Sequence, residues 1–221
     1  MGQFQSERWV NFVGLNSFNY IREHDFLKRF FLFCALLFFM VTPVAFLTPL
    51  QVTRSFGGDV WRLTAVEMAF SSGMIGGGLI IAAWGGLKNK VHTVALASMA
   101  MGVFTFALGV VPIFWIYLGF MAISGIAMPF FNTPAMVLLQ EKVEPDYLGR
   151  VFGIMGMISS SMMPLGMLVF GPIADVVKIE GLLVITGILM FVLSFFLLGS
   201  KVLVEAGKPT PKPSLEDAGA P

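Results

Sequence analysis

The sequence predicts an all-α integral membrane protein with six transmembrane helices. Of its 221 residues, 57% are hydrophobic and only 12% are charged, whereas a soluble domain is about 45–50% apolar and about 25% charged. The mean hydropathy of +0.84 points the same way. The net charge is +1, so the chain lacks the strongly basic character of a nucleic-acid-binding protein, and no nucleic-acid partner is expected.

Six apolar stretches account for the expected spans. A membrane helix needs roughly 20 mostly apolar residues to cross about 30 Å of hydrocarbon. The stretches that meet or nearly meet this length are 27–51, 63–87, 91–111, 113–139, 151–177 and 182–204. We expect a tight hairpin at Val111 and Pro112, because proline donates no backbone hydrogen bond and a single kinked helix there would greatly exceed the bilayer. Residues 27–204 therefore form the predicted membrane domain.

The two flanking segments are expected to be cytoplasmic. Residues 1–26 lack the apolar core and cleavage site of a signal peptide. They are read either as an amphipathic helix on the membrane surface or as an ordinary linker. Residues 205–221 carry Pro209, Pro211 and Pro213 among polar residues, which predicts a disordered tail.

The distribution of Lys and Arg predicts the orientation. If the amino terminus is cytoplasmic, the inner segments hold eleven of these residues and the outer segments hold three, Arg54, Arg62 and Lys178. Basic residues are concentrated on the cytoplasmic side of membrane proteins. We therefore expect a multi-pass protein of the cell (cytoplasmic) membrane with both termini cytoplasmic.

Glycine and proline are concentrated in the second, fourth and fifth stretches. Glycines four residues apart let helix backbones approach closely in lipid, and a proline in mid-span removes a backbone hydrogen bond and favours a kink. Helix packing explains most of these residues, but so dense a set also fits helices that bend or slide. The residues assigned to packing and conformational change are Gly73, Gly77, Gly78, Pro129, Pro134, Gly149, Gly153, Pro164 and Gly166.

Ionisable residues inside a membrane are costly and usually functional. Glu67, about one turn inside the second predicted span, is the clearest case and is a candidate for the pathway of protons or of a cationic substrate. Its carboxylate could instead reach the outer surface or pair with Arg62 or Arg54. Asn132 and Thr133 are added to this pathway, since they either line a cavity or hydrogen-bond to a neighbouring helix.

The composition also bears on ligands and energy source. Fifteen methionines and 23 phenylalanines suit a pocket for bulky apolar compounds, although core and lipid-facing positions explain them equally well. His24 and His92 are far apart and the single cysteine is Cys34, so no metal site is expected. No phosphate-binding loop is present, so we expect no cofactor, and a proton gradient rather than ATP as the energy source.

Four sequence segments carry a resemblance to a known family. Residues 141–152 (EKVEPDYLGRVF) resemble the loop between spans ten and eleven of major facilitator superfamily exporters, and are most similar to the macrolide-efflux branch. Residues 67–78, 125–131 and 163–166 support the match in the same order. The resemblance implies that the six helices are spans 7–12, the carboxyl-terminal half of a major facilitator fold. An amino-terminal six-helix half or a second copy of the chain would then complete it.

The resemblance also implies a cytoplasmic gate. Residues 85–90 take the place of a motif that the superfamily repeats between spans eight and nine, but this loop has Asn89 and no acidic residue. If the gate needs an acid–base contact, Glu141 and Arg150 are candidates to supply it. The alternative is that the lysines only set topology. The residues assigned to the gate are Gly86, Lys88, Lys90, Glu141, Asp146 and Arg150.

The start of the fifth span has a clear local signal. Pro145 is expected at the first helical position, where its missing N–H does no harm. Asp146 then lies in the positive first turn of the helix, and Arg150 follows close enough to pair with it.

The family resemblance implies proton-driven efflux of bulky hydrophobic compounds, macrolide-type antibiotics first. The expected partners are the lipid bilayer, a small hydrophobic substrate and protons. The alternatives are an exporter of another cargo, such as a siderophore, and a truncated or scaffold half that does not transport. No enzyme is expected, because Ser72 and Ser124 have no histidine deep in a span to act as base.

Overall fold

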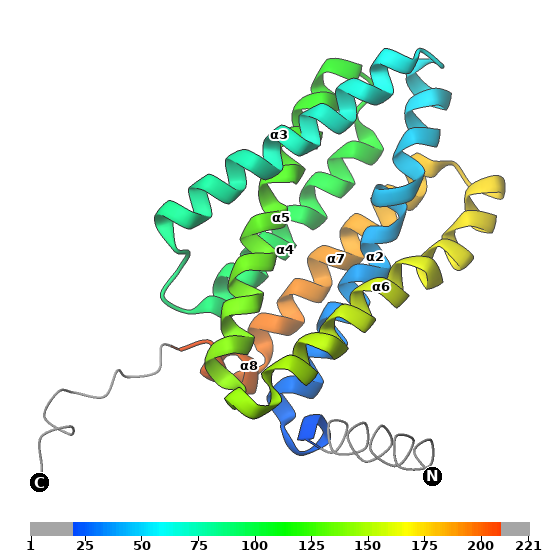
Figure 1. Ribbon diagram of the computed structural model, residues 1–221. Helices are drawn as coiled ribbons and strands as arrows, with labels where there is room; N and C mark the ends of the chain where they lie inside the picture. The colour runs from blue at the N-terminus through cyan, green and yellow to red at the C-terminus, as the bar shows by residue number, and fades with distance from the viewer. Residues whose placement is uncertain (1–19, 209–221) are drawn as a thin grey trace, which may run out of the picture.

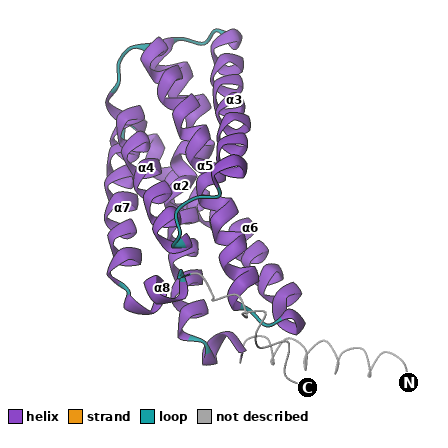
Figure 2. Cartoon of the chain, turned by 90° about the vertical axis from the view of Figure 1, so that its left-hand side faces the viewer, coloured by secondary structure: helices purple, strands orange, loops and turns teal. Residues whose placement is uncertain are grey.

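The computed structural model describes residues 20–208, which consist of helices and short connecting loops (Figure 2). Six of the helices are long and apolar enough to cross a membrane. The helices of this part of the chain are α2 (Asp25–Phe56), α3 (Val60–Trp84), α4 (Lys90–Val110), α5 (Phe114–Lys142), α6 (Pro145–Val176), α7 (Ile179–Gly199) and the short α8 (Lys201–Ala206). The predicted all-α membrane class and its six spans are confirmed.

The expected hairpin and the proline start are both present. α4 ends at Val110 and α5 begins at Phe114, so the chain reverses direction around Pro112. α6 opens with Pro145 at its first turn, and Asp146 lies in that turn.

The last predicted stretch is wrong at its end. It was expected to run to residue 204, but α7 ends at Gly199 and α8 follows after the extended residue Ser200. The side-chain amide of Asn89 donates to the Val204 carbonyl at 2.8 Å and so holds α8 against the loop before α4. Residues 205 and 206 belong to α8. The prediction that the disordered tail begins at residue 205 is wrong for these two residues. The rest of that tail, 209–221, and residues 1–19 lie outside the described residues.

The helices pack as two related three-helix units, one of α3, α4 and α5 and the other of α2, α6 and α7. α4 and α7 share the most extensive contact; α3 packs mainly on α5, and α2 mainly on α6. α4 also packs on α5, and α2 on α7. Exchanging α2 with α5, α3 with α6 and α4 with α7 leaves this pattern unchanged, as in the inverted three-helix repeats of membrane transporters. α3 and α6 lie on opposite flanks of the bundle (Figure 1).

Glycines bring the backbones together at the seam between α4 and α7. A Cβ added to Gly102 would lie 2.8 Å from the Gly187 carbonyl oxygen, and one added to Gly187 would lie 2.8 Å from the Gly102 carbonyl oxygen. Such separations are far below van der Waals contact, so only glycine fits at either position. The two residues are equivalent under the exchange of α4 with α7.

The predicted packing glycines divide into two groups. Gly73 and Gly77 lie directly against the α5 backbone, and Gly166 of α6 lies against Thr42 of α2. A Cβ on Gly78, Gly149 or Gly153, in contrast, would meet no atom of the described chain within 4 Å. These last three make no packing contact within the described chain, because they lie on open faces of α3 and α6, and their expected role stays a prediction. Pro129 and Pro134 lie inside α5, and Pro164 lies inside α6, as predicted.

Both ends of the described chain lie at one end of the bundle (Figure 1). The loops 85–89 and 143–144 are at this end too, since Tyr20 approaches Glu144 and Lys90 bonds to Gly207. We call it the basic end. Its basic residues within the described chain are Arg22, Lys28, Arg29, Lys88, Lys90, Lys142, Arg150, Lys201 and Lys208.

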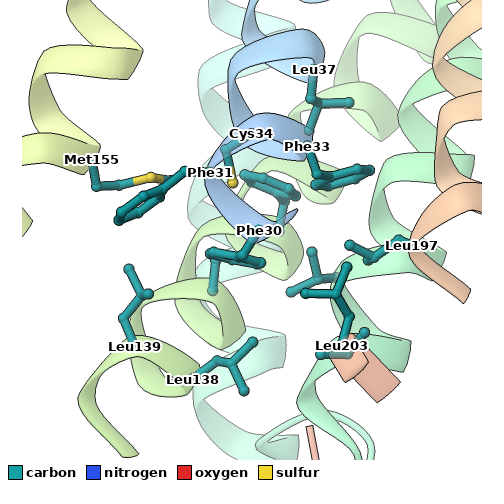
Figure 3. Close-up of a cluster of buried hydrophobic side chains, with 14 of the residues drawn as sticks. Phe30, Phe31, Phe33, Cys34, Leu37, Leu138, Leu139, Met155, Leu197 and Leu203 are labelled. Carbon is teal, nitrogen blue, oxygen red and sulfur yellow. The ribbon is translucent and has the colours of Figure 1, made fainter. Parts of the chain in front are cut away.

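Two buried apolar clusters close the bundle at its ends. At the basic end, side chains of α2 lie between Met155 of α6 on one side and Leu197 and Leu203 on the other (Figure 3). At the opposite end a second cluster surrounds Leu108 and Tyr117.

Alanine at Gly77 is expected to destabilise the chain, whereas alanine at Gly78 is neutral or stabilising. A methyl group at Gly77 would lie 2.6 Å from the Ile126 carbonyl oxygen, and overpacking of this kind costs about 1–3 kcal/mol. At Gly78 the methyl meets nothing, and alanine favours a helix by about 1 kcal/mol. The measurement is the midpoint of thermal unfolding in detergent. Equal shifts in the two variants would contradict the assignment of the α3–α5 contact to Gly77.

Candidate functional site

A cavity of about 220 Å³ lies among α2, α3, α4, α5 and α6. Its lining comes from both apolar clusters, since Val41 and Met101 belong to the cluster at the basic end and Met121 to the other. The cavity therefore lies at mid-depth in the bundle. The lining residues are Val41, Val44, Ala45, Thr48, Glu67, Phe70, Met101, Thr105, Met121, Ser124, Met128 and Met163.

The lining combines one carboxylate with soft apolar groups. Glu67 is its ionisable residue, and four of the other side chains are methionines. Thioethers are flexible and polarisable, so they adapt to ligands of irregular shape. Four of the fifteen methionines thus line one cavity, and its use for bulky apolar compounds stays a prediction.

Glu67 lies seven residues after the start of α3, which places it about 10 Å along the helix. It does not pair with either arginine proposed for it. Arg62 makes an ion pair with Asp59 at 3.4 Å and stands over the ring of Trp61. Arg54 donates to the Ala174 carbonyl at 3.2 Å. The Glu67 carboxylate is left to face the cavity and the open side of α3.

The cavity also holds hydroxyl groups. Thr48 donates to the Val44 carbonyl of its own helix. The Ser124 hydroxyl is buried and makes no hydrogen bond to any described residue. Because a buried polar group without a partner costs about 1–3 kcal/mol, Ser124 is a ready donor or acceptor for a molecule in the cavity.

Asn132 and Thr133 do not join this site. Asn132 is partly buried and Thr133 is exposed, and neither is among the residues that line the cavity with Glu67. They lie about one turn beyond Met128, the last lining residue of α5, toward the basic end. The structure therefore separates the two parts of the expected pathway.

The structure reveals a buried polar network that the sequence reasoning missed. Gln51 donates to the Leu108 carbonyl at 3.0 Å, and the Tyr117 hydroxyl donates to the Gln51 side-chain carbonyl at 2.9 Å. Both side chains are fully buried. The network ties α2, α4 and α5 together next to Thr48, which lies one turn before Gln51 and lines the cavity. Its only sequence signal is a glutamine and a tyrosine within otherwise apolar stretches.

The loop 85–89 is a folded structure rather than a simple connection. Gly85 and Gly86 have φ of +73° and +79°, which residues with side chains rarely adopt. Asn89 caps α4 by accepting a hydrogen bond from Val91 N. The Lys90 ammonium donates to the Gly85 carbonyl at 3.0 Å. Asn89 thus serves as a helix cap and as the anchor of α8.

The start of α6 differs from the expected ion pair. The Arg150 guanidinium lies 5.5 Å from the centre of the Tyr147 ring and makes no ion pair with Asp146 among the described residues. The Tyr147 ring is itself stacked on Tyr20 at 4.1 Å. The expected contact between Glu141 and Arg150 is likewise not among the ion pairs of residues 20–208. The stacking of Tyr20 on Tyr147 joins the segment before α2 to the start of α6, and Arg150 lies over Tyr147 within its own helix.

Comparison with known proteins identifies the family. The sequence pattern described as the Major Facilitator Superfamily matches residues 6–167. The chain belongs to the Major Facilitator Superfamily. It is 30% identical over 172 residues to macrolide efflux protein A of Streptococcus pyogenes, a match that covers 77% of this chain and 42% of that protein. It is 32% identical over 149 residues to macrolide efflux protein A of Enterococcus faecalis, covering 66% and 46%.

The match covers less than half the length of each of these relatives. Halves of Major Facilitator Superfamily transporters are built from two inverted repeats of three helices, which is the packing seen here. The family thus agrees with the fold, and the predicted resemblance is confirmed.

Replacing Tyr117 with phenylalanine is expected to lower the free energy of unfolding by about 1–3 kcal/mol. The substitution keeps the ring but leaves the buried Gln51 carbonyl without its donor, and such a group bears the full desolvation cost. The measurement is unfolding in detergent, followed by circular dichroism.

Thr53→Val is the matched control, because the exposed Thr53 hydroxyl bonds only to the Pro49 carbonyl of its own helix. A Tyr117→Phe variant as stable as this control would show that the network contributes little.

Proposed function

We propose that this chain is the carboxyl-terminal half, spans 7–12, of a proton-driven exporter of bulky hydrophobic compounds, with macrolide-type antibiotics as the first candidates. The observation that carries the proposal is the Glu67 carboxylate in a methionine-rich cavity at mid-depth. Substrate sites of such transporters lie near the bilayer midplane at the junction of the repeats. The similarity to two macrolide efflux proteins supports the choice of cargo.

The proposed transporter needs a second half. α3 and α6 are the least buried of the six long helices, and exposed apolar side chains such as Ile75 and Leu168 lie on them. Six helices alone do not enclose the cavity on the side where Glu67 is exposed. An amino-terminal six-helix half would cover this side, and a second copy of the chain in the same orientation is the alternative.

Proton coupling would depend on a single carboxylate. A charged Glu67 in a low-dielectric cavity is costly, and either a proton or a cationic group of the substrate neutralises it. Because one carboxylate cannot serve both at once, proton entry would displace the substrate, and release of the proton inside would restore the site. The Ser124 hydroxyl would add a hydrogen bond to the bound molecule.

Replacement of Glu67 by glutamine is expected to abolish protonophore-sensitive efflux. Glutamine keeps the size and polarity of the side chain but cannot exchange a proton. The measurement is accumulation of a labelled macrolide in susceptible bacteria that express the chain, alone and together with an amino-terminal half of a relative, with and without a protonophore.

Asp175→Asn is the matched control, since this exposed carboxylate near the end of α6 does not line the cavity. Unchanged, protonophore-sensitive efflux in Glu67→Gln would exclude Glu67 as the coupling site. Unchanged macrolide accumulation in cells with the parent chain, at good membrane expression and in both combinations, would instead favour another cargo, such as a siderophore, or a half that does not transport.

The proposed orientation places the basic end, with both termini, in the cytoplasm. A thiol at residue 58, in the loop between α2 and α3, is then expected to react with a membrane-impermeant maleimide in intact cells. A thiol at residue 88 should react only after the cells are opened. Gly58→Cys and Lys88→Cys in a Cys34→Ser background make this test, because both positions are exposed and Cys34 is the only natural cysteine. If only the thiol at residue 88 reacted in intact cells, the proposed orientation would be wrong and the basic end would face outward.

A further inference from the structure

A second hollow, distinct from the Glu67 cavity, lies on the outside of the bundle. It has a volume of about 230 Å³ and is formed by α3, α4 and α5 in the half nearer the basic end. We call it the lateral groove. Its lining is almost wholly apolar and includes Trp84, Leu96, Phe104, Ile126 and Phe130. None of its lining residues also lines the cavity with Glu67.

The groove opens on the outer surface of the helix bundle. Trp84, Leu96 and Ile123 are all substantially exposed at its edges. It exists because α3 packs on α5 and α4 packs on α5, while α3 and α4 make little contact with each other. In a chain that spans a membrane, an outward-facing apolar groove of this kind is in contact with lipid.

The dimensions of the groove match one leaflet. On α4 its lining runs from Thr93 to Phe104, which is about 16 Å at 1.5 Å per residue. One leaflet contributes about 15 Å of hydrocarbon. Trp84 lies at the end of the groove nearest the loop 85–89, and tryptophan is enriched at the level of lipid headgroups.

The loop at this end of the groove carries positive charge. Between Glu67 and Glu141 the sequence contains no acidic residue, and its basic residues there are Lys88 and Lys90, with His92 beside them. Lys88 is exposed, and Lys90 is held at the loop by its bond to the Gly85 carbonyl. Basic residues next to a crevice between membrane helices attract anionic lipid headgroups.

We propose that the lateral groove binds one acyl chain of an anionic phospholipid, with the phosphate of the headgroup at Lys88 and Lys90. The apolar length, the interfacial tryptophan and the positive charge of the loop all point to this one occupant. The site does not depend on the proposed transport activity, because it uses neither Glu67 nor the open faces of α3 and α6 that a second half would cover.

The test measures lipid contact at Trp84 itself. The chain is reduced to one tryptophan by replacing Trp9, Trp61 and Trp115 with phenylalanine, and it is reconstituted in vesicles containing brominated lipids, which quench tryptophan fluorescence on contact. Quenching by brominated phosphatidylglycerol is compared with quenching by brominated phosphatidylcholine. Each lysine near an anionic surface contributes enough for about a fivefold preference, so we expect at least a fivefold preference for phosphatidylglycerol at Trp84.

Two controls make the result specific. A chain that retains only Trp115 reports on ordinary lipid contact, since Trp115 is 70% exposed at the start of α5, away from the groove. It is expected to show no such preference. Lys88→Gln with Lys90→Gln should remove the preference at Trp84, whereas Lys201→Gln, a lysine of α8 at the same end of the bundle, should leave it unchanged.

The proposal is overturned by any of three results. These are an equal lipid preference at Trp84 and Trp115, a preference at Trp84 that survives loss of both lysines, and absence of quenching at Trp84 by either lipid, which would mean that protein covers the groove. Lys88 and Lys201 are exposed and Lys90 is partly buried, so circular dichroism is used to check that all the variants fold.

Discussion

Helices surrounded by lipid gain nothing from hiding apolar side chains, because the lipid tails are as apolar as the side chains themselves. The association of the bundle therefore rests on close contact between backbones. The glycine contact between α4 and α7 joins the two three-helix units, and the glycines of α3 fix that helix to α5. The buried network of Gln51 and Tyr117 adds polar contacts among three helices. The remaining features of the fold follow from these few points of attachment.

The same attachments determine where space remains. α3 is held mainly by α5, and α6 mainly by α2, so each flanking helix has one close neighbour and a broad free face. The Glu67 cavity forms inside, between the two apolar clusters, and the lateral groove forms outside, where α3 and α4 diverge. Glu67 and Lys88 belong to opposite halves of the bundle's depth, which keeps the carboxylate at the cavity apart from the basic end.

Features with a local cause could be predicted from the sequence, and those that need a distant partner could not. The six spans, the reversal at Pro112 and the start of α6 at Pro145 each follow from a short segment alone. Glu67 could be predicted as a candidate site residue because a carboxylate within an apolar membrane span is unusual in itself. The hydrogen bond between Gln51 and Tyr117 joins residues 66 positions apart. Neither sequence segment indicates that the other is its partner. The glycine pairs make the point most directly: Gly73 with Gly77 and Gly149 with Gly153 have the same spacing, yet only the first pair meets a neighbouring helix in the described chain.

The pairing of α2 with α6 and α7 has a consequence for biosynthesis. α3 meets its main neighbour, α5, soon after both are made, whereas α4 has α5 beside it early but meets its main neighbour, α7, only at the end. α2 is made before the other five long helices described here, yet it makes little contact with α3, and its main neighbours begin only at Pro145. At about 5–20 residues per second, translation of the intervening chain takes on the order of ten seconds. During that interval Gln51 has no folded partner on α5 until Tyr117 is inserted, and Thr42 waits longer, for Gly166. Among the six long helices, α2 is thus enclosed only after α6 and α7 are inserted, and its Gln51 side chain needs shelter at the site of insertion until α4 and α5 arrive.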